Sequence, residues 1–308
     1  MKIGRIKIVT TPDLANAYTH TGTIHADEVF GAVILILSGM NIALFRCSSV
    51  PENISPNTIV FDIGRGEYDH HQDDGRKREN GTLYASCGLL WKDFYKLVLE
   101  NFGCPENLKP EVFEDIDRHL IEGIDGIDNG MDSYNGKTNF SVMNIADIVD
   151  VFNPAWNEDT DSDKAFLDAI NIATPIFTRT IEKSIAKLSA KVFVEQAIEK
   201  SSNRVIVLDK HMPWEETVLS SNNPKAKDAL YIIYPSNRGD YSIRGIPDYV
   251  GSFNQRKPFP EEWRGLPTNA LVELTGINGI TFVHRTGFFA AASTLEDAIK
   301  IANKAVMA

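Results

Sequence analysis

One stretch, rich in histidine and acidic residues, decides the fold of this chain: His20-Thr21-Gly22-Thr23-Ile24-His25-Ala26-Asp27-Glu28. A buried strand is predicted before it, at residues 6–10, and a helix opens on its last two residues and ends at Gly39. In open α/β sheets the ligand crevice lies beyond the carboxyl ends of the strands. The stretch therefore predicts an α/β protein whose polar groups gather at that edge.

The alternation of strand and helix continues along the first two-thirds of the chain. Apolar spacing predicts strands at residues 42–47 and 58–62, and helices at 89–102 and 112–124. Such alternation is typical of a mostly parallel sheet flanked by helices. Residues 163–200 carry only helical signal, broken once at Thr174-Pro175, and predict one or two helices that close the first domain and lead to the second.

The character of the sequence changes near residue 201. Short β-rich segments are predicted at 205–209, 229–234, 241–246 and 281–285, followed by a final helix that Thr294 caps. We therefore expect two domains. Residues 1–200 would form the α/β domain with its closing helices, and residues 201–308 a smaller α+β domain.

Composition limits the classes of function. Hydrophobic residues make up 43% and charged residues 24% of the chain, as in soluble proteins, and no segment predicts a membrane span. Residues 1–200 hold 19 Lys and Arg against 31 Asp and Glu, whereas 201–308 hold 12 against 11. This acidity argues against broad binding to duplex nucleic acid. The three cysteines lack metal-site spacing, which favours reduced, buried thiols in a cytoplasmic protein.

Residues capable of binding metal fall into four clusters. Each is predicted to follow a strand or helix: the opening stretch, Asp62, the run Tyr68-Asp69-His70-His71-Gln72, and residues 123–130 with Asp125 and Asp128. Mixed imidazole and carboxylate ligands suit Mn, Fe or Zn better than Mg or Ca. The supply exceeds the needs of one ion, so we expect two divalent cations, Mn²⁺ foremost, sharing a carboxylate.

Isolated polar residues carry less weight. A single buried histidine is usually a satisfied structural group, and His119 and His211 are interpreted in that way. Four of the seven histidines lie within residues 20–71, together with Asp62. A cluster of that density favours a functional site over separate structural roles.

The combined motifs resemble the DHH phosphoesterase superfamily, and within it the melanocyte-proliferating-gene-one branch of metal-dependent exonucleases that act on RNA. The resemblance rests on motifs spread over nearly the whole chain: Thr19 to Glu28, Tyr68 to Gln72, Asp125 to Gly130, Arg256 to Leu266, and Phe282-Val283-His284. It implies a metal-binding N-terminal domain and a substrate-binding C-terminal domain. It also implies two ligand sets: His20, His25 and Asp62 for one ion, and Asp27, Asp62, His70 and Asp125 for the other.

Further roles follow from the resemblance. Asp128 is the alternative to Asp125 as a ligand. His71 would face the substrate or act as a general acid, and Asp69 would orient a histidine. In the second domain we expect phosphate contacts from basic side chains: Arg238, Arg244, Arg256, Lys257, Arg264, His284 and Arg285. Trp263 would either stack on a base or pack in the core.

The leading hypothesis is a metal-dependent phosphodiesterase that trims short single-stranded RNA or oligonucleotides, using water activated by two metals. One alternative is a hydrolase of a small phosphoanhydride or phosphomonoester, as in pyrophosphatases. The other is an RNA-binding regulator without turnover. The sequence leaves a homodimer open.

Overall fold

The fold is described by a computed structural model, which covers residues 2–72, 76–131 and 142–308. Contacts divide the chain into two compact units, Met1–Ile185 (unit 1) and Ala186–Ala308 (unit 2). The expected boundary after residue 200 falls at the end of a long helix, α6 (Ser162–Lys200), within which the contact division lies.

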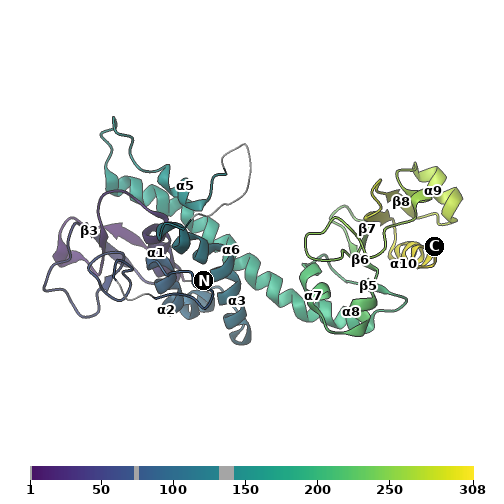
Figure 1. The fold of residues 1–308 in the computed structure, drawn as a ribbon, viewed down its shortest axis with the longest axis horizontal. Helices are drawn as coiled ribbons and strands as arrows, with labels where there is room; N and C mark the ends of the chain where they lie inside the picture. The colour runs from purple at the N-terminus through teal and green to yellow at the C-terminus, as the bar shows by residue number, and fades with distance from the viewer. Residues whose placement is uncertain (1, 73–75, 132–141) are drawn as a thin grey trace. The chain divides into compact units, whose positions relative to one another are not determined.

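Unit 1 is an α/β unit built on a parallel sheet, drawn in purple in Figure 1. Four strands pair in the order β1-β3-β2-β4, all parallel. The predicted parallel sheet is therefore confirmed. The elements of this unit, before α6, are β1 (Ile6–Ile8), β2 (Ala17–His20), α1 (Ala26–Leu37), β3 (Ile42–Cys47), β4 (Ile59–Val60), α2 (Ser86–Asn101), α3 (Lys109–Ile116), α4 (Glu122–Asp128) and α5 (Ile145–Asp150), with short 3-10 helices at Pro12–Leu14 and Glu106–Leu108.

Strand β2 was not predicted, because Ala17-Tyr18-Thr19-His20 is short and half polar. All twelve residues of α1 are buried, and α1 packs along α2 (Figure 1). A helix hydrophobic all round belongs in a core. The packing of α1 therefore holds its first residues in a defined position at one edge of the sheet.

One helical prediction needs correction. The segment 112–124 is not one α-helix: α3 passes into a π-helical turn, Asp117–Ile121, before α4 begins. Of the one or two helices predicted over residues 163–200, the structure has a single helix, because α6 runs through Pro175. The Thr174 hydroxyl donates to the Ile170 carbonyl at 2.7 Å, and the helix continues past the missing proline N–H.

Unit 2 is a mixed sheet with helices. Strand order is β5-β6-β7-β9-β8; β5 pairs with β6 in parallel and the other pairs are antiparallel. Its elements are β5 (Val205–Val207), α7 (Glu215–Ser220), α8 (Pro224–Asp228), β6 (Tyr231–Pro235), β7 (Tyr241–Gly245), α9 (Thr268–Thr275), β8 (Ile280–Val283), β9 (Phe289–Ala292) and α10 (Leu295–Met307), with a 3-10 helix at Glu261–Trp263.

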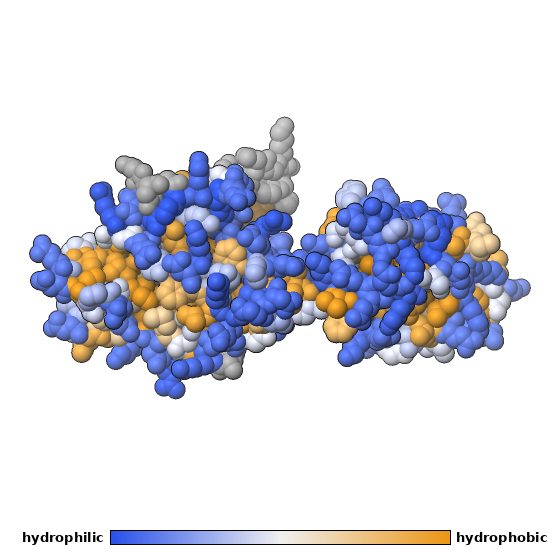
Figure 2. All heavy atoms as spheres, turned by 90° about the horizontal axis from the view of Figure 1, so that it is seen from below, coloured by the Kyte–Doolittle hydropathy of each residue, from blue (hydrophilic) through white to orange (hydrophobic). Residues whose placement is uncertain are grey.

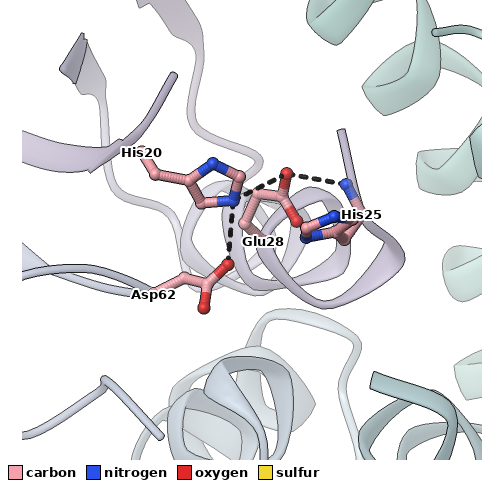
Figure 3. A group of neighbouring side chains, drawn as sticks. All are labelled: His20, His25, Glu28 and Asp62. Atoms are coloured by element: carbon pink, nitrogen blue, oxygen red, sulfur yellow. Dashed lines mark hydrogen bonds and ion pairs between the residues drawn. The ribbon is translucent and has the colours of Figure 1, made fainter. Parts of the chain in front are cut away.

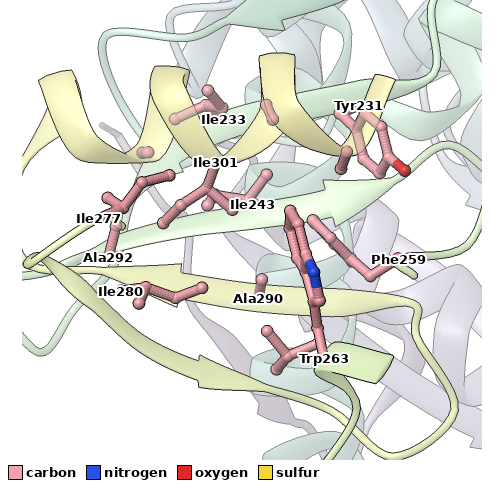
Figure 4. Packing of buried hydrophobic residues seen from close by; sticks show 14 of the residues in the cluster. Tyr231, Ile233, Ile243, Phe259, Trp263, Ile277, Ile280, Ala290, Ala292 and Ile301 are labelled. Carbon is pink, nitrogen blue, oxygen red and sulfur yellow. The ribbon is translucent and has the colours of Figure 1, made fainter. Parts of the chain in front are cut away.

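Helix α10 packs against the unit 2 sheet and contributes buried residues to its core. Its buried Ile301 belongs to the same cluster as Ile243 of β7 and Ala290 of β9, and Figure 4 shows α10 lying along the strands. Trp263 is 3% exposed within this cluster, so it packs in the core and is not available to stack on a base.

The surface of each unit is mostly hydrophilic on the side drawn in Figure 2, with smaller hydrophobic patches. Over the described ranges, no helix combines the length and apolarity needed to cross a membrane. The three cysteines are free and buried, as predicted.

Candidate metal centre

Strand pairing in unit 1 brings two of the predicted clusters to the same edge. Strand β2 ends at His20, and its partner β4 leads directly to Asp62, with Tyr18 opposite Val60. The Asp62 amide donates to the Tyr68 carbonyl at 3.0 Å, which folds the third cluster back onto the same edge. Asp62 has a left-handed backbone (φ 57°), a conformation that aspartate tolerates better than most residues.

His20 lies at the centre of the first group of ligands. Its Nε2 is 3.1 Å from Asp62 Oδ2 and 3.3 Å from Glu28 Oε1, as Figure 3 shows. The His25 ring lies beside it, with centroids 5.4 Å apart. Burial lowers the pKa of His20, but the two carboxylates outweigh this effect and raise that pKa to about 10. In the absence of other cations, His20 therefore carries the positive charge that these carboxylates require.

Glu28 is a member of the group that sequence reasoning did not assign. It is fully buried at the first turn of α1, and its Oε1 accepts the His25 backbone N–H at 2.8 Å. This is a capping box in which His25 occupies the N-cap position. The three-residue spacing from His25 to Glu28 was the available signal.

Several buried acceptor atoms at this edge have no hydrogen-bond partner within the described part of the chain: Asp27 Oδ1, Asp27 Oδ2, Asp62 Oδ1 and Glu28 Oε2. Burial raises the pKa of Asp27 well above its ordinary value, and the charges of Asp62 and Glu28 raise it further. Buried carboxylates are costly unless they are paired or bind metal. This donor set fits divalent cations.

His70 connects the third cluster to the others. Its Nδ1 lies 3.4 Å from Asp62 Oδ1 and 3.9 Å from Asp27 Oδ2, and its Nε2 lies 2.9 Å from Asp128 Oδ2. Three sets of side chains consequently offer ligand atoms within 4.8 Å of one another: His20, His25, Glu28 and Asp62; Asp62, Asp69, His70 and His71; and His25, Asp27 and Asp128.

Asp125, the favoured ligand in the sequence analysis, is not in any of these sets. Its Oδ1 accepts the Gly88 N–H at 2.9 Å and its Oδ2 accepts from Arg78 at 2.8 Å. Burial raises the pKa of Asp125 to about 7, although Arg78 opposes the shift. Both oxygens are thus engaged away from the histidines, whereas Asp128, the alternative ligand, lies 2.9 Å from His70.

Asp69 holds His71 in position. Its Oδ1 accepts the His71 backbone N–H at 3.0 Å and lies 2.7 Å from the ring Nδ1, while its Oδ2 accepts from the Arg65 amide at 2.6 Å. Burial opposes the ionised form of Asp69, but these contacts lower its pKa. The His71 side chain is 60% exposed. A ring anchored through Nδ1 in this way leaves Nε2 available for an incoming group.

The loop that carries His20 and His25 is held from both sides. The buried Arg46 donates to the carbonyls of His20 and Gly22, each at 3.3 Å. The Asn153 side chain accepts the Ile24 N–H at 2.7 Å and donates to the Ile24 carbonyl at 2.9 Å. These bonds between residues distant in sequence fix the loop geometry, and they could not be foreseen from motif spacing.

A cavity of about 460 Å³ opens beside these ligands. Its polar lining combines the predicted ligands with acidic side chains from α5: His25, Asp62, His70, His71, Asp128, Asp147 and Asp150. Isoleucine and alanine side chains from the first loop, α4 and α5 complete the wall. The cavity gives a small ligand direct access to these groups.

Three of the predicted phosphate-binding residues of unit 2 are engaged internally. The Arg256 guanidinium donates to the carbonyls of Ala226, Lys227 and Ala229 at the end of α8, at 2.7–3.0 Å. Lys257 donates to Val306 near the end of α10, and Arg264 donates to Phe259. Basic groups at helix C-termini satisfy carbonyls that the helix leaves free.

The remaining candidates are more accessible. Arg238 and Arg285 are exposed, and Arg244 and His284 are half-buried. Arg244 lies 3.7 Å from Glu215, and His284 Nδ1 lies 2.9 Å from the Thr286 hydroxyl. These four stay candidates for substrate contact.

The engagement of Arg256 leads to a prediction about stability. Arg256→Ala should destabilise unit 2 by about 1.5–3 kcal/mol, the usual cost of losing charged hydrogen bonds, and leave KM unchanged. Urea unfolding of the full chain, with Arg238→Ala as the exposed control, measures the effect. A raised KM without loss of stability would instead return Arg256 to the substrate-binding set.

Comparison with known proteins gives a consistent family. Residues 16–306 match the model of a family described as MYG1_exonuc, an uncharacterised protein family (UPF0160). A MYG1 protein of Schizosaccharomyces pombe is 30% identical over 96% of this chain and 98% of its own length. The human MYG1 exonuclease is 28% identical, over 98% of this chain and 87% of its own. No solved structure matches the chain.

Proposed function

Since this chain belongs to the MYG1 exonuclease family (UPF0160), we propose that it is a divalent-metal-dependent exonuclease with the metal chemistry of DHH phosphoesterases. The observation that carries the proposal is the shared position of Asp62. Its carboxylate lies within reach of both His20 and His70, between two sets of candidate ligands. A carboxylate so placed suits two ions held a few ångströms apart.

The contacts favour a specific division of ligands. One ion would be held by His20, His25, Glu28 and Asp62, and the other by Asp27, Asp62, His70 and Asp128. Imidazole mixed with carboxylate favours Mn²⁺ over Mg²⁺, because magnesium prefers all-oxygen ligation. This division differs from the sets that the family resemblance implies in two ways: Glu28 is added to the first set, and Asp128, the alternative ligand, takes the place of Asp125 in the second.

The protein's own side chains supply the remaining chemistry. When bound, two cations would lower the pKa of a water and stabilise charge on the phosphate oxygens. His71, anchored by Asp69, would donate a proton to the leaving oxygen. Arg46 and Asn153 keep the His20–His25 loop in one geometry and so reduce reorganisation during the reaction.

The proposed substrate is a short single strand of RNA or another oligonucleotide, trimmed from an end. The acidic residues 1–200 would repel a long polyanion running past the centre, whereas a chain end needs to bring only one phosphate to the cations. Proteins named MYG1 exonuclease among the relatives support attack at an end.

Incubation with linear RNA and the circular form of the same sequence tests this proposal. With Mn²⁺ present, the linear strand should be shortened stepwise and the circle should resist, and EDTA should stop the reaction. Comparable cleavage of both forms would exclude end trimming. Release of phosphate from pyrophosphate, with neither RNA cleaved, would favour a small-phosphate hydrolase.

A further inference from the structure

The sheet of unit 2 has one face that α10 does not cover. Side chains alternate between the two faces of the sheet along each strand. Ile243 and Ala290, which are paired across β7 and β9, belong to the core under α10. The neighbouring residues Arg244 and Phe289 are also opposite each other and point the other way. On β8, Phe282 lies opposite Ala291 and shares this second face.

Only part of that second face is covered within the described residues. A core cluster covers β5 and β6 and includes Ile198 of α6, Val218 of α7 and Ile232 of β6. The cluster does not extend to β8 or β9. Phe282 is accordingly 43% exposed, which is unusual for a phenylalanine in the middle of a strand.

The uncovered side chains form a connected aromatic surface. Ring centroids of Phe282 and Phe289 are 6.1 Å apart, those of Phe289 and Phe288 are 6.0 Å apart, and those of Phe288 and His284 are 4.7 Å apart. Phe282 also lies 6.1 Å from His284, which closes the group. We call Arg244, Phe282, His284, Phe288 and Phe289 the aromatic face.

Arg244 places a positive charge at the edge of these rings. Its guanidinium carbon lies 6.0 Å from the Phe288 ring centroid and 5.7 Å from that of Trp214. Its Nε is buried and has no hydrogen-bond partner among the described residues. The nearest carboxylate, Glu215, is 3.7 Å away, too far for a close bidentate pair. The donor capacity of Arg244 is therefore incompletely used.

We infer that the aromatic face binds the bases of single-stranded nucleic acid, with Arg244 on an adjacent phosphate. Exposed aromatic rings on an open sheet face stack unpaired bases, and a nearby arginine provides the charge complement of the backbone. Unit 2 is suited to this role because its acidic and basic residues nearly balance, unlike residues 1–200. The choice of ligand rests on the proposed function, since a nuclease must hold the strand that it trims.

Binding without turnover tests the inference. The full-length protein in EDTA is titrated into a fluorescein-labelled oligoadenylate and into an abasic oligomer of the same length, with anisotropy as the readout. Wild type should prefer the oligoadenylate. Phe282→Ala should weaken that binding about tenfold, within the range for one lost base stack, and leave abasic binding unchanged.

Matched variants separate stacking from hydrophobicity and charge. Phe282→Tyr keeps a ring and should bind within about twofold of wild type, whereas Phe282→Leu should behave like Phe282→Ala. Arg244→Gln should weaken both oligomers. Trp156→Ala removes a more exposed aromatic side chain, from unit 1, and should change nothing. Thermal unfolding of each variant checks that the fold is kept.

The outcomes distinguish this inference from the proposed function. Phe282→Ala binding like wild type, while Mn²⁺-dependent trimming continues, would overturn the inference and leave the nuclease intact. Base-dependent binding lost in Phe282→Ala, in a protein that cleaves no RNA, would support the face and refute the nuclease. Sedimentation showing that Phe282→Ala only abolishes self-association would make the face a contact between copies and overturn the inference.

Discussion

Asp62→Asn is expected to lose both divalent cations and at least about a thousandfold in activity. The carboxylate is 2% exposed and lies between His20 on one side and His70 on the other. Removal of its charge therefore weakens both ligand sets at once, and a loss of several kcal/mol of charge stabilisation corresponds to that factor. Asparagine is chosen because it tolerates the left-handed backbone of Asp62, so lost charge is separated from added strain.

Elemental analysis after gel filtration measures the occupancy. His20→Ala should lose about one cation only, because the second set does not contain His20. Asp168→Asn, in an exposed carboxylate of α6, serves as the control and should retain full occupancy. Two cations still bound in Asp62→Asn would refute a shared carboxylate, whatever the activity.

Much of the centre could be predicted from sequence because the order of the strands determines which side chains come together. The prediction of a parallel sheet already places the groups that follow strands at one edge. His20 and Asp62 met as expected, since β2 and β4 are neighbours. The prediction missed β2 itself, yet the result was the same, because the residue types and not the strand boundaries determined which side chains were candidates.

The different surroundings of Asp125 and Asp128 could not be predicted in the same way. Both lie on α4, three residues apart, and either side chain can face the sheet edge, depending on how the helix is rotated about its axis. The π-helical turn before α4 adds a residue to one turn and shifts that rotation. Arg78, which is distant in sequence, then binds the Asp125 carboxylate away from the histidines. Neither effect can be predicted from the spacing of apolar residues at intervals of about 3.6 residues.

The basic residues of unit 2 show a related limit. Sequence marks Arg256 and Arg264 as candidates by their setting among proline and tryptophan, but a loop that closes over helix ends needs the same residue types. The backbone carbonyls that these side chains satisfy become visible only once α8 and the loop are placed. The aromatic face was missed for the opposite reason: Phe282 and Phe289 have the sequence signature of core residues, and their exposure depends on which strands the helices leave uncovered.

The network around Arg78 carries the other large expected effect, on stability. Its guanidinium forms a forked pair with Asp117, both distances being 2.6 Å, and a further bond of 2.8 Å to Asp125. It also lies 4.2 Å from the Tyr84 ring centroid. Gly88 completes the packing, because a Cβ there would meet Asp125 Oδ2 at 1.9 Å. All of these groups are close to α4, on which Asp128 lies.

Arg78→Ala should destabilise the protein by about 3–5 kcal/mol, because it leaves two buried carboxylates without their counter-charge. For a unit of this size such a loss lowers Tm by roughly 10 °C. Lys164→Ala breaks an exposed ion pair of 2.7 Å and should cost less than about 0.5 kcal/mol. Calorimetry of both variants compares the buried pair with the exposed one, and a shift in Arg78→Ala as small as that of the control would refute the role of the network.

The pH dependence of Arg78→Ala gives a sharper test. Burial already raises the pKa of Asp125 to about 7, and Arg78 is the main group that opposes the rise. Without Arg78 that pKa goes higher, so the folded variant holds a proton on Asp125 that the unfolded chain releases near its ordinary value. A raised carboxylate pKa contributes stability at low pH that is lost as pH rises through the folded value. The deficit relative to wild type should therefore be smaller at pH 6 than at pH 9, and a deficit that shrinks as pH rises would contradict the assignment of Asp125 to Arg78.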